Sequence, residues 1–315
     1  MTTLSKIKKR LFVFGCSYTA YCWPSWADFL SCEYEVYENW GLAGIGNRAI
    51  AERITECHAK NNFTKDDVII VQWSTHIRND FFHQEGRLTK RVGGWKTAGS
   101  VFNYLNGEIY DSKWYETFFD EEAYFMHTLN HILMTQMFLE NTGATWYMTS
   151  IGDVRNLGTD IDITSSYGEQ SIFYKIKERF SSINEPYFGY RVTPSLKVYN
   201  KPIWEDRKDR WVQPIGAWVI DNNKDPFYSF TGENGEKFSD YHPKPSHHKD
   251  WLVKFLIPKL EIEPDIEKYN KIAEDCDILR TRMINDTKRD YEMALFHWKF
   301  NLPKWPNMIK GFITF

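Results

Sequence analysis

Short apolar runs that alternate with helical segments limit the fold of this chain more than any other feature. Three runs lack the polar alternation of a half-exposed strand, which is typical of strands buried on both faces. They are Leu11–Gly15, Val68–Gln72 and Ala144–Thr149. Segments with helical spacing, 48–60 and 121–140, lie between them. This order predicts a parallel sheet of about five strands between two layers of helices, a three-layer α/β/α sandwich.

The α/β domain is expected to cover residues 1–257 and to carry two long insertions, at 79–119 and 154–238. The second insertion holds five prolines among aromatic and charged residues, which predicts irregular or small-strand structure. The last stretch, 258–315, has apolar residues at helical spacing. It is therefore predicted to form a helical extension.

Composition and charge argue against several classes of protein. The net charge of −3 gives no general reason to expect nucleic-acid binding. The five cysteines are odd in number and include no CxxC pair, so they predict neither a disulfide framework nor a zinc site. Free thiols in a reducing compartment are the simpler interpretation. The aromatic fraction of 17% is high, and exposed Trp and Tyr often form adhesive surfaces for sugars or proteins.

The N-terminal segment has the charge pattern of a signal peptide but not its length. The basic stretch Lys6–Arg10 precedes the apolar run Leu11–Cys16, which is shorter than the roughly 7 residues such a peptide needs. No apolar run reaches the roughly 18 residues of a transmembrane helix. We therefore expect no membrane partner and a cytoplasmic protein.

The residues that can carry chemistry follow the first predicted strand and precede the last helix of the domain. Ser17 lies in a glycine-containing turn after the strand, which places a hydroxyl at the carboxyl edge of the sheet. His242 can reach the same edge from the other end of the domain, and Asp240 can hold its imidazole ring in one tautomer. Ester hydrolysis needs a nucleophile, a base that deprotonates it and donors aimed at the developing oxyanion, and Ser17 and His242 can supply the first two.

Other residue pairs allow competing interpretations. Cys16 is a rival nucleophile, but adjacent side chains on a strand face opposite ways, so we expect Cys16 to face the core. His127 and His131 have a metal-compatible spacing, but the Glu of the zinc-protease motif is missing, so no metal is expected. Arg78 can contact an anionic substrate group or form a surface ion pair. The aromatic stretches can stack on sugar rings or pack the insertions onto the sheet.

Four blocks in this order resemble the SGNH/GDSL hydrolase superfamily. They are Phe14–Thr19, with Cys16 where the name-giving Asp usually stands, Asn39–Asn47, Val68–His76 and Asp240–Pro243. The resemblance covers roughly residues 10–80, 120–153 and 239–257, which leaves the long insertion and the extension unexplained.

The resemblance implies a role for each matching residue. Ser17 is the expected nucleophile and His242 the expected base, and the N–H groups of Ser17 and Gly44 are expected to hold the oxyanion. Thr75 stands where the family has an Asn that donates to the oxyanion, and a hydroxyl can donate in its place. Asp240 precedes His242 by two residues where three is usual. Further candidates for substrate binding are Ser74, Asn47 and Arg78.

These features predict a serine esterase that needs no metal or organic cofactor and removes O-acyl groups such as acetyl from a carbohydrate. The carbohydrate part rests on the aromatic content and on the habit of the family. The alternative is a non-catalytic structural or glycan-binding protein on the same scaffold, which oligomerises or docks to a larger assembly through its terminal helix. Such a combination resembles proteins encoded by large phages, and its location would then be the virion.

Overall fold

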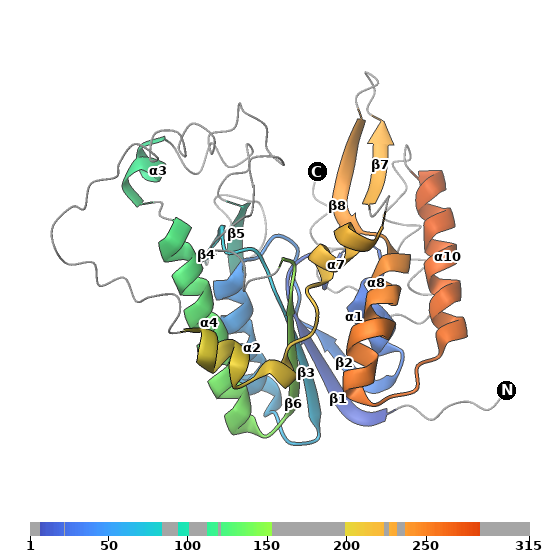
Figure 1. Ribbon diagram of the computed structural model, residues 1–315, viewed down its shortest axis with the longest axis horizontal. Helices are drawn as coiled ribbons and strands as arrows, with labels where there is room; N and C mark the ends of the chain where they lie inside the picture. Colours follow the sequence, from blue (N-terminus) through green and yellow to red (C-terminus); the bar gives the residue numbers. More distant parts are fainter. Residues whose placement is uncertain are drawn as a thin grey trace.

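The centre of the protein is a parallel sheet with the strand order β2-β1-β3-β6 (Figure 1). The computed structural model describes residues 7–21, 23–83, 94–100, 112–118, 121–152, 199–223, 227–231 and 237–283. The strands are β1 (Ile7–Phe14), β2 (Tyr34–Asn39), β3 (Asp67–Trp73) and β6 (Thr145–Ser150). Every neighbouring pair is parallel, which confirms the predicted parallel sheet. The described residues hold four of its strands, against the roughly five expected.

Helices cover the sheet on both faces (Figure 1). One layer holds α2 (Asn47–Asn61) and α4 (Glu121–Thr142), and the other holds α1 (Trp26–Ser31) and α8 (Pro245–Trp251). Each residue of β3 is buried, because helices shield both of its faces from water. The continuous apolar run in the sequence is therefore explained by the layered packing.

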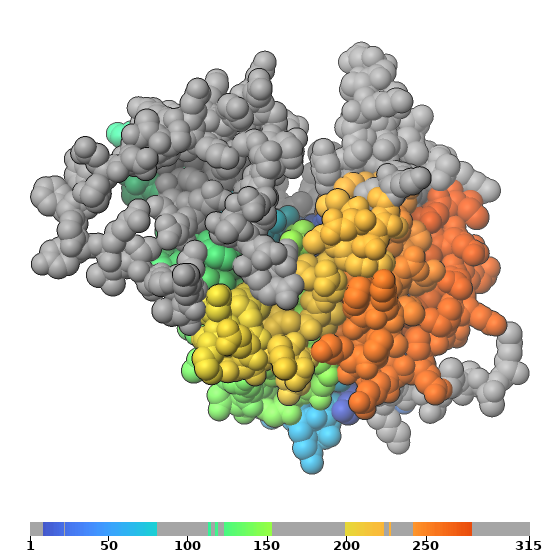
Figure 2. All heavy atoms as spheres, viewed as in Figure 1, coloured from blue at the N-terminus to red at the C-terminus, as the bar shows by residue number. Residues whose placement is uncertain are grey.

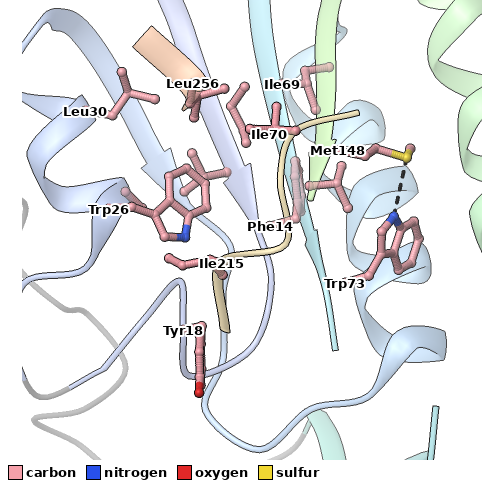
Figure 3. Packing of buried hydrophobic residues seen from close by; sticks show 14 of the residues in the cluster. Phe14, Tyr18, Trp26, Leu30, Ile69, Ile70, Trp73, Met148, Ile215 and Leu256 are labelled. Atoms are coloured by element: carbon pink, nitrogen blue, oxygen red, sulfur yellow. Dashed lines mark hydrogen bonds between the residues drawn. The ribbon is translucent and has the colours of Figure 1, made fainter. Parts of the chain in front are cut away.

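The core lies where β1 and β3 meet the two helical layers (Figure 3). Phe14 and Ile70 from the two central strands are fully or almost fully buried. Trp26 of α1 is also fully buried, and Trp73 Nε1 donates to Met148 Sδ at 3.3 Å. Burying one such side chain stabilises a fold by roughly 1.5–3 kcal/mol, so these contacts hold the sheet edge that carries the site.

Two antiparallel ribbons lie outside the central sheet. The first pairs β4 (Arg78–His83) with β5 (Gly94–Ser100), in the stretch predicted as the first insertion, which also holds α3 (Ser112–Phe118). The second pairs β7 (Phe227–Thr231) with β8 (Lys237–Pro243). The block Asp240–Pro243 therefore lies on a strand. The predicted insertion 154–238 falls outside the described residues as far as position 198.

The described part of the second insertion packs beside the C-terminal helices (Figure 2). It contains the π-helical segment η3 (Lys201–Glu205), the 3₁₀ turn η4 (Lys208–Arg210) and α7 (Ile215–Asn222). Trp211 forms a parallel bridge with Met148 of β6, next to the sheet edge. This segment thus extends the sheet by a single bridge and covers its β6 side.

The C-terminal part of the chain continues from α8 into the same core. A π-helical segment, η5 (Leu252–Leu256), and α9 (Ile257–Leu260) lead to α10 (Ile266–Met283). Helix α10 packs against α8, and its Tyr269 is fully buried with its ring 5.5 Å from that of Phe29. The predicted extension beyond Met283 lies outside the described residues. No helix in the described part is long and apolar enough to cross a membrane.

Candidate active site

Four segments that are distant in the sequence meet at the carboxyl edge of the sheet. Three of these segments follow β1, β2 and β3, and the fourth is the end of β8. The connection from β1 leads to β2 on one side, while β3 lies on the other side of β1. Such a reversal of strand order is where open α/β sheets bind their ligands.

A tight turn after β1 presents Ser17. The N–H groups of Thr19 and Ala20 both donate to the carbonyl of Cys16, at 2.9 and 3.0 Å. Gly15 precedes this turn, and a Cβ there would lie 2.2 Å from Thr19 Oγ1 and 3.0 Å from the backbone oxygen of Gln72. The close approach of β1 and β3 therefore requires glycine at this position.

The side chain of Gln72, on β3, forms a hydrogen bond with the turn. Its Oε1 accepts a hydrogen bond from Thr19 Oγ1 at 3.0 Å, and its Nε2 donates to the carbonyl of Trp73 at 2.7 Å. Cys16 is fully buried, with Sγ 3.6 Å from the same Oε1. The prediction that Cys16 faces the core is thus confirmed. Sequence reasoning did not single out Gln72, although a glutamine in an otherwise apolar buried strand was a signal.

Ser17 and His242 are in hydrogen-bond contact although 225 residues separate them. Ser17 Oγ lies 2.7 Å from His242 Nε2. Ser17 is only 4% exposed and His242 is half-buried, so water competes little for this contact. With the imidazole proton on Nδ1, the serine hydroxyl donates to Nε2, as a nucleophile does to its general base.

Two aromatic residues just after Ser17 contact the histidine segment. The ring of Tyr21 stacks on the imidazole of His242 with centroids 3.7 Å apart and planes 17° from parallel. Trp23 is fully buried, and its Nε1 donates to the carbonyl of Pro243 at 3.0 Å. Sequence reasoning did not identify these contacts, and the only signal was the aromatic character of the segment that follows Ser17.

Asp240 is the least defined of the predicted catalytic residues. Its backbone lies in β8, opposite Tyr228 of β7, but its side chain falls outside the described residues. Its predicted contact with His242 therefore stays a prediction.

The loop that holds Gly44 is tied to the turn that holds Ser17. The N–H of Leu42 donates to the carbonyl of Gly15 at 3.0 Å, and Asn39 Nδ2 donates to that of Thr19 at 3.0 Å. Gly44 has a φ of +85°, a left-handed conformation that favours glycine. The predicted oxyanion donor thus lies on a loop that one backbone and one side-chain hydrogen bond tie to the turn.

A carboxylate that sequence reasoning missed caps the helix after this loop. Asp80 is almost fully buried, and it accepts hydrogen bonds from the N–H groups of Gly46 and Ala49 at 2.7 and 3.1 Å. The first N–H groups of a helix lack partners within the helix, and a negative charge there is favourable. The signal in the sequence was the pair Asn79-Asp80, shortly after the third block.

Arg78 contacts the same loop. Its Nη1 donates at 2.9 Å to the carbonyl of Ile45, the residue that follows Gly44 in the chain. Arg78 is half-buried and holds the loop through this hydrogen bond. Its contact with an anionic substrate group stays a prediction.

Asn47 joins the second block to the third. Its Oδ1 accepts from the N–H of Ser74 at 2.8 Å, and its Nδ2 donates to the Ser74 carbonyl and to Thr128 Oγ1 at 3.2 and 3.1 Å. Both polar atoms of its side chain are therefore engaged within the protein. Ser74 Oγ is buried and has no hydrogen-bond partner among the described residues, and Thr75 beside it is half-buried.

A second histidine lies close to His242. His248 of α8 is 1% exposed, and its ring meets that of Tyr18 edge-on, with centroids 6.2 Å apart. Burial, with smaller contributions from His242 and His247, lowers the pKa of His248 to about 3. His248 is therefore neutral at physiological pH and adds no positive charge beside the site.

The histidines of α4 have another environment. His127 is exposed and His131 is half-buried. Within the described part of the chain, no group of three or more His, Cys, Asp or Glu residues can hold a metal ion.

Comparisons with protein-family models, with curated proteins and with solved structures found no match to this chain. The family resemblance therefore rests on the four sequence blocks. These blocks are joined at one sheet edge by the hydrogen bonds described above.

Proposed function

We propose that this protein is a serine ester hydrolase of SGNH type. The observation that carries the proposal is the 2.7 Å contact between Ser17 Oγ and His242 Nε2. Proton transfer to a base requires such a distance, and two residues 225 positions apart reach it at the carboxyl edge of the sheet. The ordered turn around Ser17 and the glycine loop beside it add to this support.

In the proposed reaction, Ser17 Oγ forms a bond to the acyl carbon while its proton passes to His242 Nε2. The N–H groups of Ser17 and Gly44 stabilise the resulting oxyanion, with a hydroxyl of Thr75 or Ser74 as a further donor. His242 then gives the proton to the alcohol that leaves. Water, deprotonated by His242, releases the acid from the acyl-enzyme. Asp240 orients the imidazole, and the chemistry needs no metal or organic cofactor.

The proposed substrate is an O-acylated carbohydrate, with acetyl as the acyl group. Its support is the high aromatic content, since Trp and Tyr rings stack well on sugars. Docking to a larger, phage-like assembly through the C-terminal helix belongs to the alternative proposal, a non-catalytic protein on the same scaffold. The proposed location is the cytoplasm, or the virion for a phage-encoded protein.

Hydrolysis of p-nitrophenyl acetate and of O-acetylated glycans by the purified protein tests the proposal. We expect Ser17→Ala to lower kcat by about 10³-fold or more, because the nucleophile is lost while the oxyanion donors remain. Cys16→Ala is the matched control and should retain activity. Unchanged turnover in Ser17→Ala would exclude Ser17 as the nucleophile.

The second candidate, a non-catalytic binding protein, predicts a different result. The wild-type protein would then retain O-acetylated glycans on a column without releasing acetate. Release of acetate from simple esters only would support the esterase but contradict the carbohydrate substrate.

A further inference from the structure

The segment that carries the nucleophile also holds the base. Tyr21 lies four residues after Ser17, and its ring covers one face of the His242 imidazole at a centroid distance of 3.7 Å. The ring of Trp23 meets that of Tyr21 edge-on at 4.5 Å, and its Nε1 binds the carbonyl of Pro243. The side chain and the backbone of the histidine segment are therefore held by Tyr21 and Trp23, respectively.

We propose that Tyr21 is a positioning residue that sets the plane of the His242 ring and stabilises its positive charge during the reaction. This inference rests on the proposed function and adds a residue to it. A near-parallel stack, 17° between planes, leaves the imidazole free to slide but not to tilt. Rotation of the imidazole about its Cβ–Cγ bond, which would turn Nε2 away from Ser17, would tilt the ring and break the stack.

The stack stabilises the charged form of the base more than the neutral form. As Ser17 Oγ bonds to the acyl carbon, its proton moves to His242 Nε2 and the ring becomes an imidazolium. The π face of Tyr21 attracts a cation more strongly than a neutral ring. Tyr21 therefore acts on the transition state, and the effect belongs to kcat and not to KM.

The phenol hydroxyl has no part in this effect, so two variants separate the ring from the hydroxyl. We expect Tyr21→Leu to lower kcat about tenfold with KM within about twofold, the loss expected for one partly buried cation–π contact. Tyr21→Phe keeps the π face and should stay within about twofold of the wild type in kcat. An equal loss in both variants, or no loss in Tyr21→Leu, would overturn the inference.

Tyr147→Leu is the matched control for the loss of a half-buried tyrosine. Tyr147 lies on β6, and its hydroxyl donates to the carbonyl of Lys259, away from Ser17 and His242. Its replacement should leave kcat unchanged. If Tyr21→Leu does not fold, Tyr21→Met gives the same test, because it fills much of the volume without a π face.

Labelling by a fluorophosphonate separates failure of this inference from failure of the proposed function. Ser17 Oγ forms a bond to phosphorus, fluoride leaves, and the hydroxyl proton passes to His242, so no ester substrate has to be known. We expect the wild type and Tyr21→Phe to label at similar rates and Tyr21→Leu about tenfold more slowly. Equal rates in all three would overturn the inference and leave the proposed function standing. A wild type that does not label at Ser17 would overturn both.

Discussion

Burial of a titratable residue beside the site has a consequence for stability. His248 takes up a proton near pH 6.5 in the unfolded chain, but in the folded protein burial lowers its pKa to about 3. Between these two values the unfolded chain binds more protons than the folded protein. The contribution of His248 to stability is therefore complete above pH 6.5 and is lost as the pH falls toward 3.

Urea unfolding at pH 7 and pH 5.5 measures this loss. We expect the free energy of unfolding to fall by roughly 1.4 kcal/mol per pH unit below 6.5 from His248, the value for one proton. His248→Leu should flatten this dependence, whereas His127→Ala, at an exposed position on α4, should keep it. The same slope in His248→Leu would contradict the assignment.

A second prediction concerns Gly15. Gly15→Ala places a Cβ 3.0 Å from the backbone oxygen of Gln72, which cannot move without disturbing β3. We expect a loss of about 1–3 kcal/mol in stability and a clear loss of activity, because the Ser17 turn shifts. Gly152→Ala is the control, since a Cβ there meets nothing within 4 Å. Thermal unfolding of the two variants makes the comparison.

The stability of helix α2 and the shape of the Gly44 loop depend on the same group of hydrogen bonds. Asp80 comes from another element, β4, and replaces the side-chain cap that Gly46 lacks at the start of the helix. The helix start, the loop before it and the first residues of β4 therefore form one hydrogen-bonded unit.

Removal of the carboxylate tests this unit. Asp80→Ala should cost about 1–2 kcal/mol, the range for loss of a helix cap, and should lower kcat because the Gly44 loop relaxes. Asp66→Ala, at an exposed turn before β3, removes a carboxylate of the same size and should change neither. Urea unfolding and ester turnover give the two readings. A stable Asp80→Ala variant with full activity would exclude the role.

At the scale of the whole molecule, a helix from the C-terminal stretch packs onto one of the two helical layers. Helix α10 packs on α8, and Tyr269 extends from it to Phe29 of α1, so the layer on this face depends on residues after 258. This packing also supports the histidine segment, because α8 directly follows β8.

Loss of the Tyr269 ring should destabilise the protein as a whole. We expect Tyr269→Ala to cost about 3–5 kcal/mol, as for other large aromatic residues in cores, and Tyr269→Phe to stay within about 1 kcal/mol. Guanidinium unfolding followed by tryptophan fluorescence measures both. A Tyr269→Ala variant as stable as the wild type would show that α10 folds onto the domain without contributing to its core.

Local patterns were enough to predict three strands of the central sheet, two of its helices and the turn that holds Ser17. Apolar runs and helical spacing reflect burial directly, so β1, β3, β6, α2 and α4 lie within a few residues of their predicted positions. The separation of Asp240 from His242 by two residues was visible in the sequence, but their placement on a strand was not. That strand, β8, pairs with β7, and the sequences of the two strands show no clear alternation of polar and apolar residues.

Tertiary structure alone decided which side chains meet at the site. The stack of Tyr21 on His242 and the cap from Asp80 to Gly46 join elements that are distant in the chain and leave no periodic trace in it. The contact of Ser17 with His242 was expected from a motif, but its length of 2.7 Å depends on how β8 and the turn after β1 pack together. Sequence by itself determined the layers and the place of Ser17 in its turn, because burial and turns are local. The fold determined how His242 is held, because its contacts require two distant segments at one sheet edge.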